Sequence, residues 1–130
     1  MVKVDQRRHR RLFRALLAVW LACVILGSLA SGSELASLEK VLPFLEWSDK
    51  IQHIGAYAVL AVLWMLAFEG WRRVAAALSM ILLGVLLEAA QHYAPGRTPD
   101  LSDAVANALG VLAGMALGFV LTRQASASVR

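Results

Sequence analysis

The sequence predicts an all-α integral membrane protein built as a four-helix bundle. Hydrophobic residues make up 59% of the 130 residues and the mean hydropathy is +0.63, whereas soluble domains average about 45–50% apolar residues. Four apolar stretches, at about 12–30, 51–68, 74–92 and 104–121, are each close to the roughly 20 residues that a helix needs to cross a bilayer. Because they occupy nearly the whole chain, residues 1–130 are expected to form a single transmembrane domain.

The distribution of basic residues predicts the orientation of the bundle. Ten of the 13 lysines and arginines lie in segments that share one side if the four helices alternate, and they are Lys3, Arg7, Arg8, Arg10, Arg11, Arg14, Arg72, Arg73, Arg123 and Arg130. Loops rich in lysine and arginine stay in the cytoplasm. Both termini are therefore expected to be cytoplasmic, and the loops at about 31–50 and 93–103 are expected to face outward.

The first apolar stretch follows the arginine-rich N-terminus. Beside an apolar helix, such a cluster is typical of a topology signal, so we expect no nucleic-acid partner. The same pattern also opens cleavable signal peptides, here with Ala15–Ala30 as the apolar core and small residues at 31–33. Cleavage would leave three spans with the chain ends on opposite sides, so we expect an uncleaved span and keep cleavage as the alternative. Cys23, inside this stretch, is interpreted as a packing residue.

A short helix is expected between the first two spans. Its apolar residues recur at helical spacing and are Leu35, Leu38, Val41, Leu42 and Leu45. Ser31 and Glu34 fit a capping box at its start, and Pro43 is expected to end or bend it. Phe44 and Trp47 suit the headgroup layer, so we expect the helix to lie in the membrane interface, as a tether or as the rim of a site.

The remaining spans are connected by one short and one turn-rich segment. The connection at 69–73 is short, so the second and third spans are expected to be antiparallel neighbours. The fourth span follows the turn-rich segment 95–99 and carries Gly110, Gly114 and Gly118, a stripe that lets another helix approach closely. We expect this stripe to pack inside the bundle. Dimerisation is the alternative, and the oligomeric state is left open.

Each of the last three spans carries one polar stripe near its expected outer end. Span by span, the residues are Asp49, His53 and Tyr57, then Glu88 and Gln91, then Asp103 and Asn107. Their spacings of three and four residues keep each stripe on one helical face. In the fourth span this face is also that of the glycine stripe, so Asp103 and Asn107 are expected to face protein.

Depth along the helices predicts that these stripes meet. At about 1.5 Å per residue, the polar residues of all three spans lie about 6–8 Å inside the outer ends. We expect a cluster of His53, Tyr57, Glu88, Gln91, Asp103 and Asn107 beneath a lid of Asp49, Lys50, Arg97 and Asp100. A carboxylate as deep as Glu88 must be protonated or partnered, and its candidate partners are His53, Asn107, Tyr57 and Arg97. A purely structural network is the alternative to a functional site.

Three motifs occur in a fixed order along the chain. They are Asp49-Lys50-x-x-His53 with Tyr57, Glu88-x-x-Gln91, and Arg97-x-x-Asp100-x-x-Asp103 with Asn107 and Gly110. Over roughly residues 45–120 this succession resembles the VanZ-like family of small bacterial membrane proteins, although Pro99 and Ala58 depart from the family pattern. The resemblance implies a polytopic protein of the bacterial cell envelope, placed in the inner (cytoplasmic) membrane. The family's namesake gives low-level resistance to the glycopeptide antibiotic teicoplanin, and the resemblance implies no biochemical mechanism.

The polar site is first interpreted as a headgroup site. Arg97 and Lys50 suit a phosphate, while the acidic and histidine layer suits orientation or proton transfer. The expected partner is a membrane lipid or a lipid-linked cell-wall precursor at the outer leaflet. Whether the site binds or catalyses is left open.

Two other classes of function compete with this interpretation. A metal-dependent membrane enzyme would use His53, Glu88 and Asp103 as ligands, with Asp49 as a fourth. Since there is one well-placed histidine and no paired histidine spacing, we expect no metal and no cofactor. A structural or transport accessory subunit is the third class, but the polar groups lie only in the outer halves of the helices, with no pathway through the inner halves.

Overall fold

The computed structural model describes residues 2–41 and 49–127, and every element in these two segments is a helix. In chain order the helices are α1 (Val2–Leu29), α2 (Gly32–Val41), α3 (Asp49–Ala67), α4 (Trp71–Gln91) and α5 (Leu101–Ala127). Segments long and apolar enough to cross a membrane are Arg7–Leu29, Asp49–Ala67, Trp71–Gln91 and Leu101–Gln124. The predicted all-α membrane bundle is therefore confirmed, with span boundaries a few residues from those expected.

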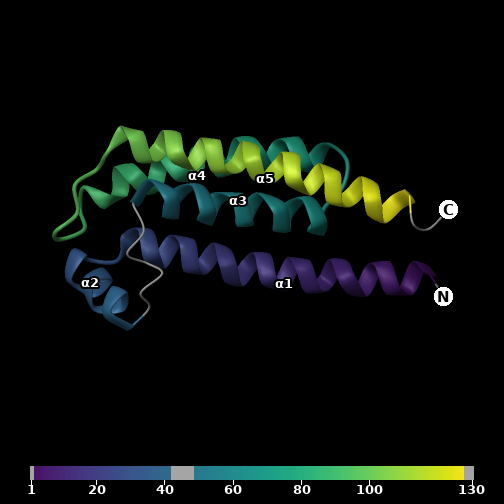
Figure 1. Cartoon of the computed structure of the whole chain (residues 1–130), viewed down its shortest axis with the longest axis horizontal. Coiled ribbons are helices and arrows are strands. Elements are labelled where there is room, and N and C mark those ends of the chain that lie inside the picture. Colours follow the sequence, from purple (N-terminus) through teal and green to yellow (C-terminus); the bar gives the residue numbers. More distant parts are fainter. Residues whose placement is uncertain (1, 42–48, 128–130) are drawn as a thin grey trace.

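Helix α3 lies between α1 on one side and the pair α4 and α5 on the other (Figure 1). Helix α1 begins and α5 ends at the same end of the bundle. The opposite end holds α2, the start of α3 and the loop from α4 to α5 (Figure 1). The polar stripes therefore occupy the end of the bundle remote from the arginine-rich segments.

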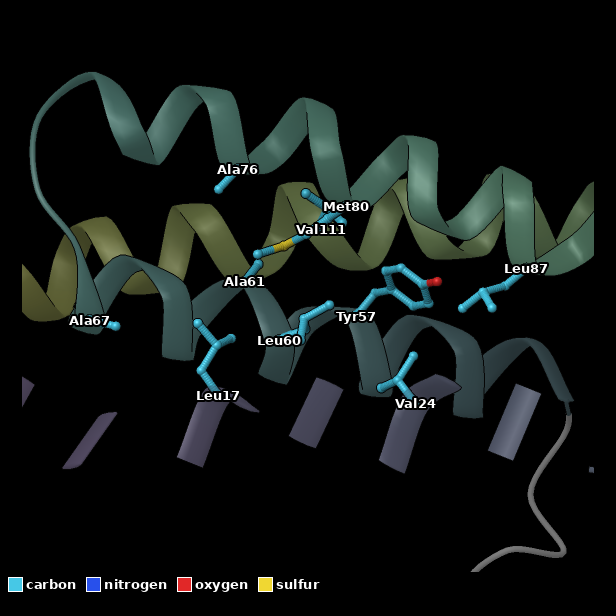
Figure 2. Close-up of a cluster of buried hydrophobic side chains, with 10 residues drawn as sticks. All are labelled: Leu17, Val24, Tyr57, Leu60, Ala61, Ala67, Ala76, Met80, Leu87 and Val111. Carbon is cyan, nitrogen blue, oxygen red and sulfur yellow. The ribbon is translucent and has the colours of Figure 1, made fainter. Parts of the chain in front are cut away.

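Side chains from all four long helices form a narrow core along α3 (Figure 2). Its members include Leu17 and Val24 of α1, Tyr57, Leu60 and Ala61 of α3, Met80 and Leu87 of α4, and Val111 of α5. The outward faces stay apolar, as at Leu78, Leu82 and Leu112, which are more than half exposed. Such an exposed apolar surface is unfavourable in water and suits lipid chains.

The glycine stripe lets α5 lie directly against α3. A Cβ atom added to Gly110 or Gly114 would overlap the backbone oxygen of Ile54 or Ala58, and one on Gly118 would lie 2.6 Å from the Cβ of Met65. Without side chains at these positions, the two backbones approach closely. This contact fixes the register of α5 on α3, and with it the position of the polar residues one and two turns further out.

Helix α2 begins with the capping box that the sequence predicts. The Ser31 backbone N–H donates to Glu34 Oε2 at 2.8 Å, and the Glu34 N–H donates to Ser31 Oγ at 3.3 Å. The Gly32 N–H donates to the Pro95 carbonyl at 3.1 Å, so the start of α2 contacts the loop between α4 and α5. The predictions for Leu42, Pro43, Phe44, Leu45 and Trp47 lie outside the described residues.

Candidate functional site

Five polar side chains are buried together near the end of the bundle. Tyr57 comes from α3, Glu88 and Gln91 from α4, and Asp103 and Asn107 from α5, and each is at most 6% exposed. The hydroxyl of Tyr57 points along the bundle toward the same end as Leu87 (Figure 2). Above them, the side chains of Asp49, Lys50 and Asp100 are more than half exposed. The site thus has a buried floor and an exposed rim.

His53 connects α3 to α5 in the middle of this site. Its Nδ1 lies 2.8 Å from Asn107 Oδ1, within hydrogen-bond distance. Its Nε2 lies 3.8 Å from Asp49 Oδ1 on its own helix and 3.8 Å from Asp103 Oδ2 on α5. The imidazole is therefore held on one nitrogen and faces two carboxylates with the other.

Gly84 makes room for Asn107 beside α4. A Cβ atom at Gly84 would lie 3.0 Å from both the Cβ and the Nδ2 of Asn107. Because that distance is tighter than ordinary van der Waals contact, a larger residue at position 84 would displace the amide. The positioning of His53 therefore involves all three helices of the site.

The partner of Glu88 differs from the side chains that the sequence suggested. Glu88 Oε1 accepts a hydrogen bond of 2.6 Å from the backbone N–H of Asp100. Among the described residues, no side-chain hydrogen bond or ion pair joins Glu88 to its candidate partners His53, Asn107, Tyr57 and Arg97. The expectation of a side-chain partner was wrong because the loop after α4 folds back over the helix end and presents a main-chain donor there.

Asp100 caps α5 and pairs with Lys50. Its Oδ1 accepts a hydrogen bond of 2.8 Å from the Ser102 N–H, as in an N-cap. Lys50 Nζ lies 3.3 Å from Asp100 Oδ2 and 3.5 Å from Asp103 Oδ1. Hydrogen bonding from Ser102, followed by the Lys50 ammonium, lowers the pKa of Asp100 to about 2. Asp100 is therefore an anion at any physiological pH.

Arg97 stands apart from the other candidates. Its backbone N–H donates to the Ala94 carbonyl at 3.2 Å, and its side chain is half-buried. Among residues 2–41 and 49–127, no carboxylate lies within ion-pair distance of its guanidinium. Tyr57 Oη, Glu88 Oε2 and Gln91 Nε2 likewise have no hydrogen-bond partner in the described part of the chain.

Two contributors to the site were not found from the sequence. Ser102 supplies the N–H that holds Asp100, and the signal was present, since Asp before an apolar helix predicts an N-cap. The second contributor is the contact of Gly32 with the loop at Pro95 and Gly96, which the sequence indicates less clearly. Gly96 has φ +74°, a conformation that favours glycine, but nothing in the sequence pairs it with α2.

Asp49, His53 and Asp103 could together hold a metal ion. Each offers one ligand atom, and the three atoms lie within 4.8 Å of one another. Glu88, a ligand in the metal-dependent alternative predicted from the sequence, is not a member of this group.

The order of these motifs along the chain agrees with one family. The family model VanZ/LLP1 matches residues 13–122. The chain belongs to the VanZ/LLP1 family. The match covers α1 from Phe13 to its end, the whole of α2 to α4, most of α5 and every polar residue of the site. No curated protein and no solved structure gives a significant match. The predicted family resemblance is confirmed, and the chain is a VanZ-like multi-pass membrane protein.

Proposed function

We propose that this VanZ-like protein binds the phosphate-bearing headgroup of a membrane lipid or of a lipid-linked cell-wall precursor, at the outer face of the bacterial inner membrane. The observation that carries the proposal is the set of unpartnered buried atoms: Tyr57 Oη, Glu88 Oε2 and Gln91 Nε2. A buried donor or acceptor without a partner costs about 1–3 kcal/mol. A headgroup with phosphate and hydroxyl groups supplies acceptors for Tyr57 and Gln91 and a donor for Glu88.

Two cations at the same end of the bundle support a phosphate ligand. The guanidinium of Arg97, with no carboxylate partner among the described residues, presents a planar fork of donors that matches phosphate oxygens. Lys50 stays more than half exposed although it pairs with Asp100, so its ammonium remains accessible. Both residues lie on segments that cover the buried floor.

The distribution of charge supports an outward-facing site. The described arginines 7, 8, 10, 11, 14, 72, 73 and 123 lie toward the end of the bundle opposite the polar floor. By the positive-inside rule that end is cytoplasmic. The site then lies at the outer leaflet, where lipid headgroups and lipid-linked precursors are within reach.

Native mass spectrometry of the full chain in a neutral detergent tests headgroup binding. One arm uses short-chain phosphatidylglycerol and the other undecaprenyl pyrophosphate, both with EDTA present, so that the two sources of phosphate are distinguished. We expect binding in at least one arm and a loss of about tenfold in affinity for Arg97→Gln, the effect of removing one hydrogen bond to a charged group. A teicoplanin-susceptibility assay with the same variant tests whether glycopeptide resistance depends on this site.

Arg123→Gln is the matched control. Arg123 carries the same charge at the other end of α5, where its guanidinium lies 4.3 Å from the ring centroid of Phe119. Its loss should leave headgroup binding unchanged. Equal binding by the Arg97 and Arg123 variants, or no binding of either ligand by the wild type, would refute the proposal.

A further inference from the structure

The group formed by Asp49, His53 and Asp103 has the composition of a metal site. Helix α3 supplies Asp49 and His53 at i and i+4, which places them on one face, and α5 supplies Asp103 from the facing helix. One ligand atom from each lies within 4.8 Å of the other two. The imidazole and the Asp103 carboxylate are at least 90% buried, whereas Asp49 is exposed on the rim. Two buried ligands and one exposed ligand thus meet at the boundary with solvent.

The hydrogen bond from Asn107 prepares His53 as a ligand. Asn107 Oδ1 lies 2.8 Å from Nδ1 and, as an acceptor, favours the ring form in which Nδ1 carries the proton and Nε2 has the lone pair that binds a metal. Metal-binding histidines are oriented in this way by an acceptor on the other ring nitrogen. Nε2 faces Asp49 and Asp103 at 3.8 Å, beyond hydrogen-bond distance, so it makes no hydrogen bond to either carboxylate.

The observed separations are close to those of a coordinated ion. Ligand atoms about 2.1 Å from a tetrahedral metal are about 3.4 Å apart. Both carboxylate contacts of His53 Nε2 exceed that value by only a few tenths of an ångström. Asp49 is exposed in the first turn of α3, so its side chain can move toward the other two without displacing packed neighbours.

Charge and unsatisfied hydrogen bonding also favour a cation. Among the side chains of Asp49, Lys50, Asp100 and Asp103, three carboxylates face one ammonium. This excess of two negative charges matches a divalent ion. The buried Asp103 Oδ1 has the Lys50 ammonium 3.5 Å away and no hydrogen-bond partner among the described residues, so a metal ion would add the close contact that favours a buried anion.

We propose that Asp49, His53 and Asp103 bind one divalent metal ion, zinc or manganese, and that Asn107 is the positioning residue of this site. Imidazole with carboxylate oxygens is a ligand set that both metals accept. Three protein ligands leave a coordination position open for water or another oxygen ligand. The sequence had suggested no metal and had named Glu88 as a ligand of the alternative, but Glu88 is bound instead to the Asp100 N–H. This site goes beyond headgroup binding and does not depend on it.

Metal titration of the full chain tests this proposal without any lipid. The chain is purified in neutral detergent without a polyhistidine tag, stripped with EDTA and titrated with Zn²⁺ and Mn²⁺ by calorimetry, with elemental analysis of the dialysed product. We expect saturable binding of one ion per chain. His53→Gln and Asp49→Asn should each weaken it at least about 100-fold, whereas Asn107→Ala should weaken it about 10–100-fold, the range for partners of ligating histidines.

Matched controls separate this site from adventitious binding and from misfolding. His92→Gln removes an exposed histidine at the end of α4 and should bind metal as the wild type does. Asp49 is exposed on the rim, so its variant should keep the wild-type helical circular dichroism. The ¹⁵N shifts of the imidazole should report a ring protonated on Nδ1 in the metal-free wild type, and a loss of this preference in Asn107→Ala. A wild-type ring protonated on Nε2 instead would contradict the positioning role of Asn107. No saturable binding by the wild type, or equal binding by the His53 and His92 variants, overturns the metal site.

Discussion

The imidazole of His53 on α3 and the side-chain amide of Asn107 on α5 are joined at 2.8 Å inside an apolar bundle. Asn107 is only 2% exposed, so water does not replace His53 as its partner. A hydrogen bond in such surroundings is electrostatically stronger than in water, and its loss leaves two polar groups unsatisfied. The pair therefore links two helices and also sets the orientation of the imidazole.

Asn107→Ala should destabilise the bundle by about 1–3 kcal/mol, the cost of leaving a buried polar group without its partner. Thermal unfolding in detergent with EDTA present measures this effect independently of metal. The control is Ser79→Ala, since Ser79 Oγ is exposed and bonds only to the Ala75 carbonyl of its own helix. An Asn107 variant as stable as the Ser79 variant would mean that the hydrogen bond does not contribute.

Helical spacing accounts for the helices and for the faces that they bury. The 3.6-residue period places Asp103 and Asn107 on the face of the glycine stripe, and that face lies against α3 because Gly110 and Gly114 admit its backbone. The same period puts Tyr57 and Glu88 inside. These relationships depend only on local geometry and on the need to bury small and polar residues between helices.

Loop conformation is not encoded by any such period. The partner of Glu88 is the main-chain N–H of Asp100, twelve positions away across a turn whose course depends on Gly96 at positive φ and on a contact with Gly32. The grouping of Asp49 with Asp103 also needs the relative rotation of α3 and α5, which a single sequence does not specify. The helices of the site and the residues Asp49, His53 and Asp103 could therefore be named from the sequence, but the main-chain partner that separates Glu88 from them could not.

Glu88→Leu should release the loop between α4 and α5, because it removes the acceptor for the Asp100 N–H. Trypsin cleavage after Arg97 then becomes faster, since proteolysis follows local opening of the chain. Glu88→Gln keeps a carbonyl oxygen that accepts the same hydrogen bond, so its cleavage rate should stay near that of the wild type. Equal rates for the Leu variant and the wild type would show that this bond does not hold the loop.

Gly114→Ala should destabilise the contact between α3 and α5, because the new Cβ overlaps the Ala58 carbonyl and lies 2.8 Å from the Ala61 Cβ. Forcing extra volume into a packed interface costs about 1–3 kcal/mol, visible as a lower midpoint of thermal unfolding. Gly55→Ala is the control on the neighbouring helix, since nothing lies within 4 Å of its added Cβ. If the Gly114 and Gly55 variants had the same unfolding midpoint, the glycine stripe would not be part of the packed interface.

Acid should weaken the contact between α1 and the turn after α3. The ion pair with Arg10 is the main cause that lowers the pKa of Glu69 below its usual 4.5. A depressed carboxyl pKa in the folded state adds stability above the unfolded pKa and loses it as the pH falls through the folded value. The difference in unfolding midpoint between the wild type and Glu69→Gln should therefore be present at pH 7 and shrink as the pH falls below the usual carboxyl pKa of 4.5. If the difference in unfolding midpoint did not change with pH, the effect of Glu69→Gln would come from packing and not from the ion pair.

The orientation of the bundle can be tested with single cysteines. The native Cys23 is exposed and is first replaced by alanine, after which Thr98→Cys labels the loop over the site and Arg123→Cys labels the opposite end of α5. If the arginine-rich end is cytoplasmic, a membrane-impermeant maleimide applied to intact cells or spheroplasts should modify position 98 and should reach position 123 only after lysis. If only position 123 were labelled in intact cells, the polar site would face the cytoplasm. A headgroup ligand would then have to come from the inner leaflet.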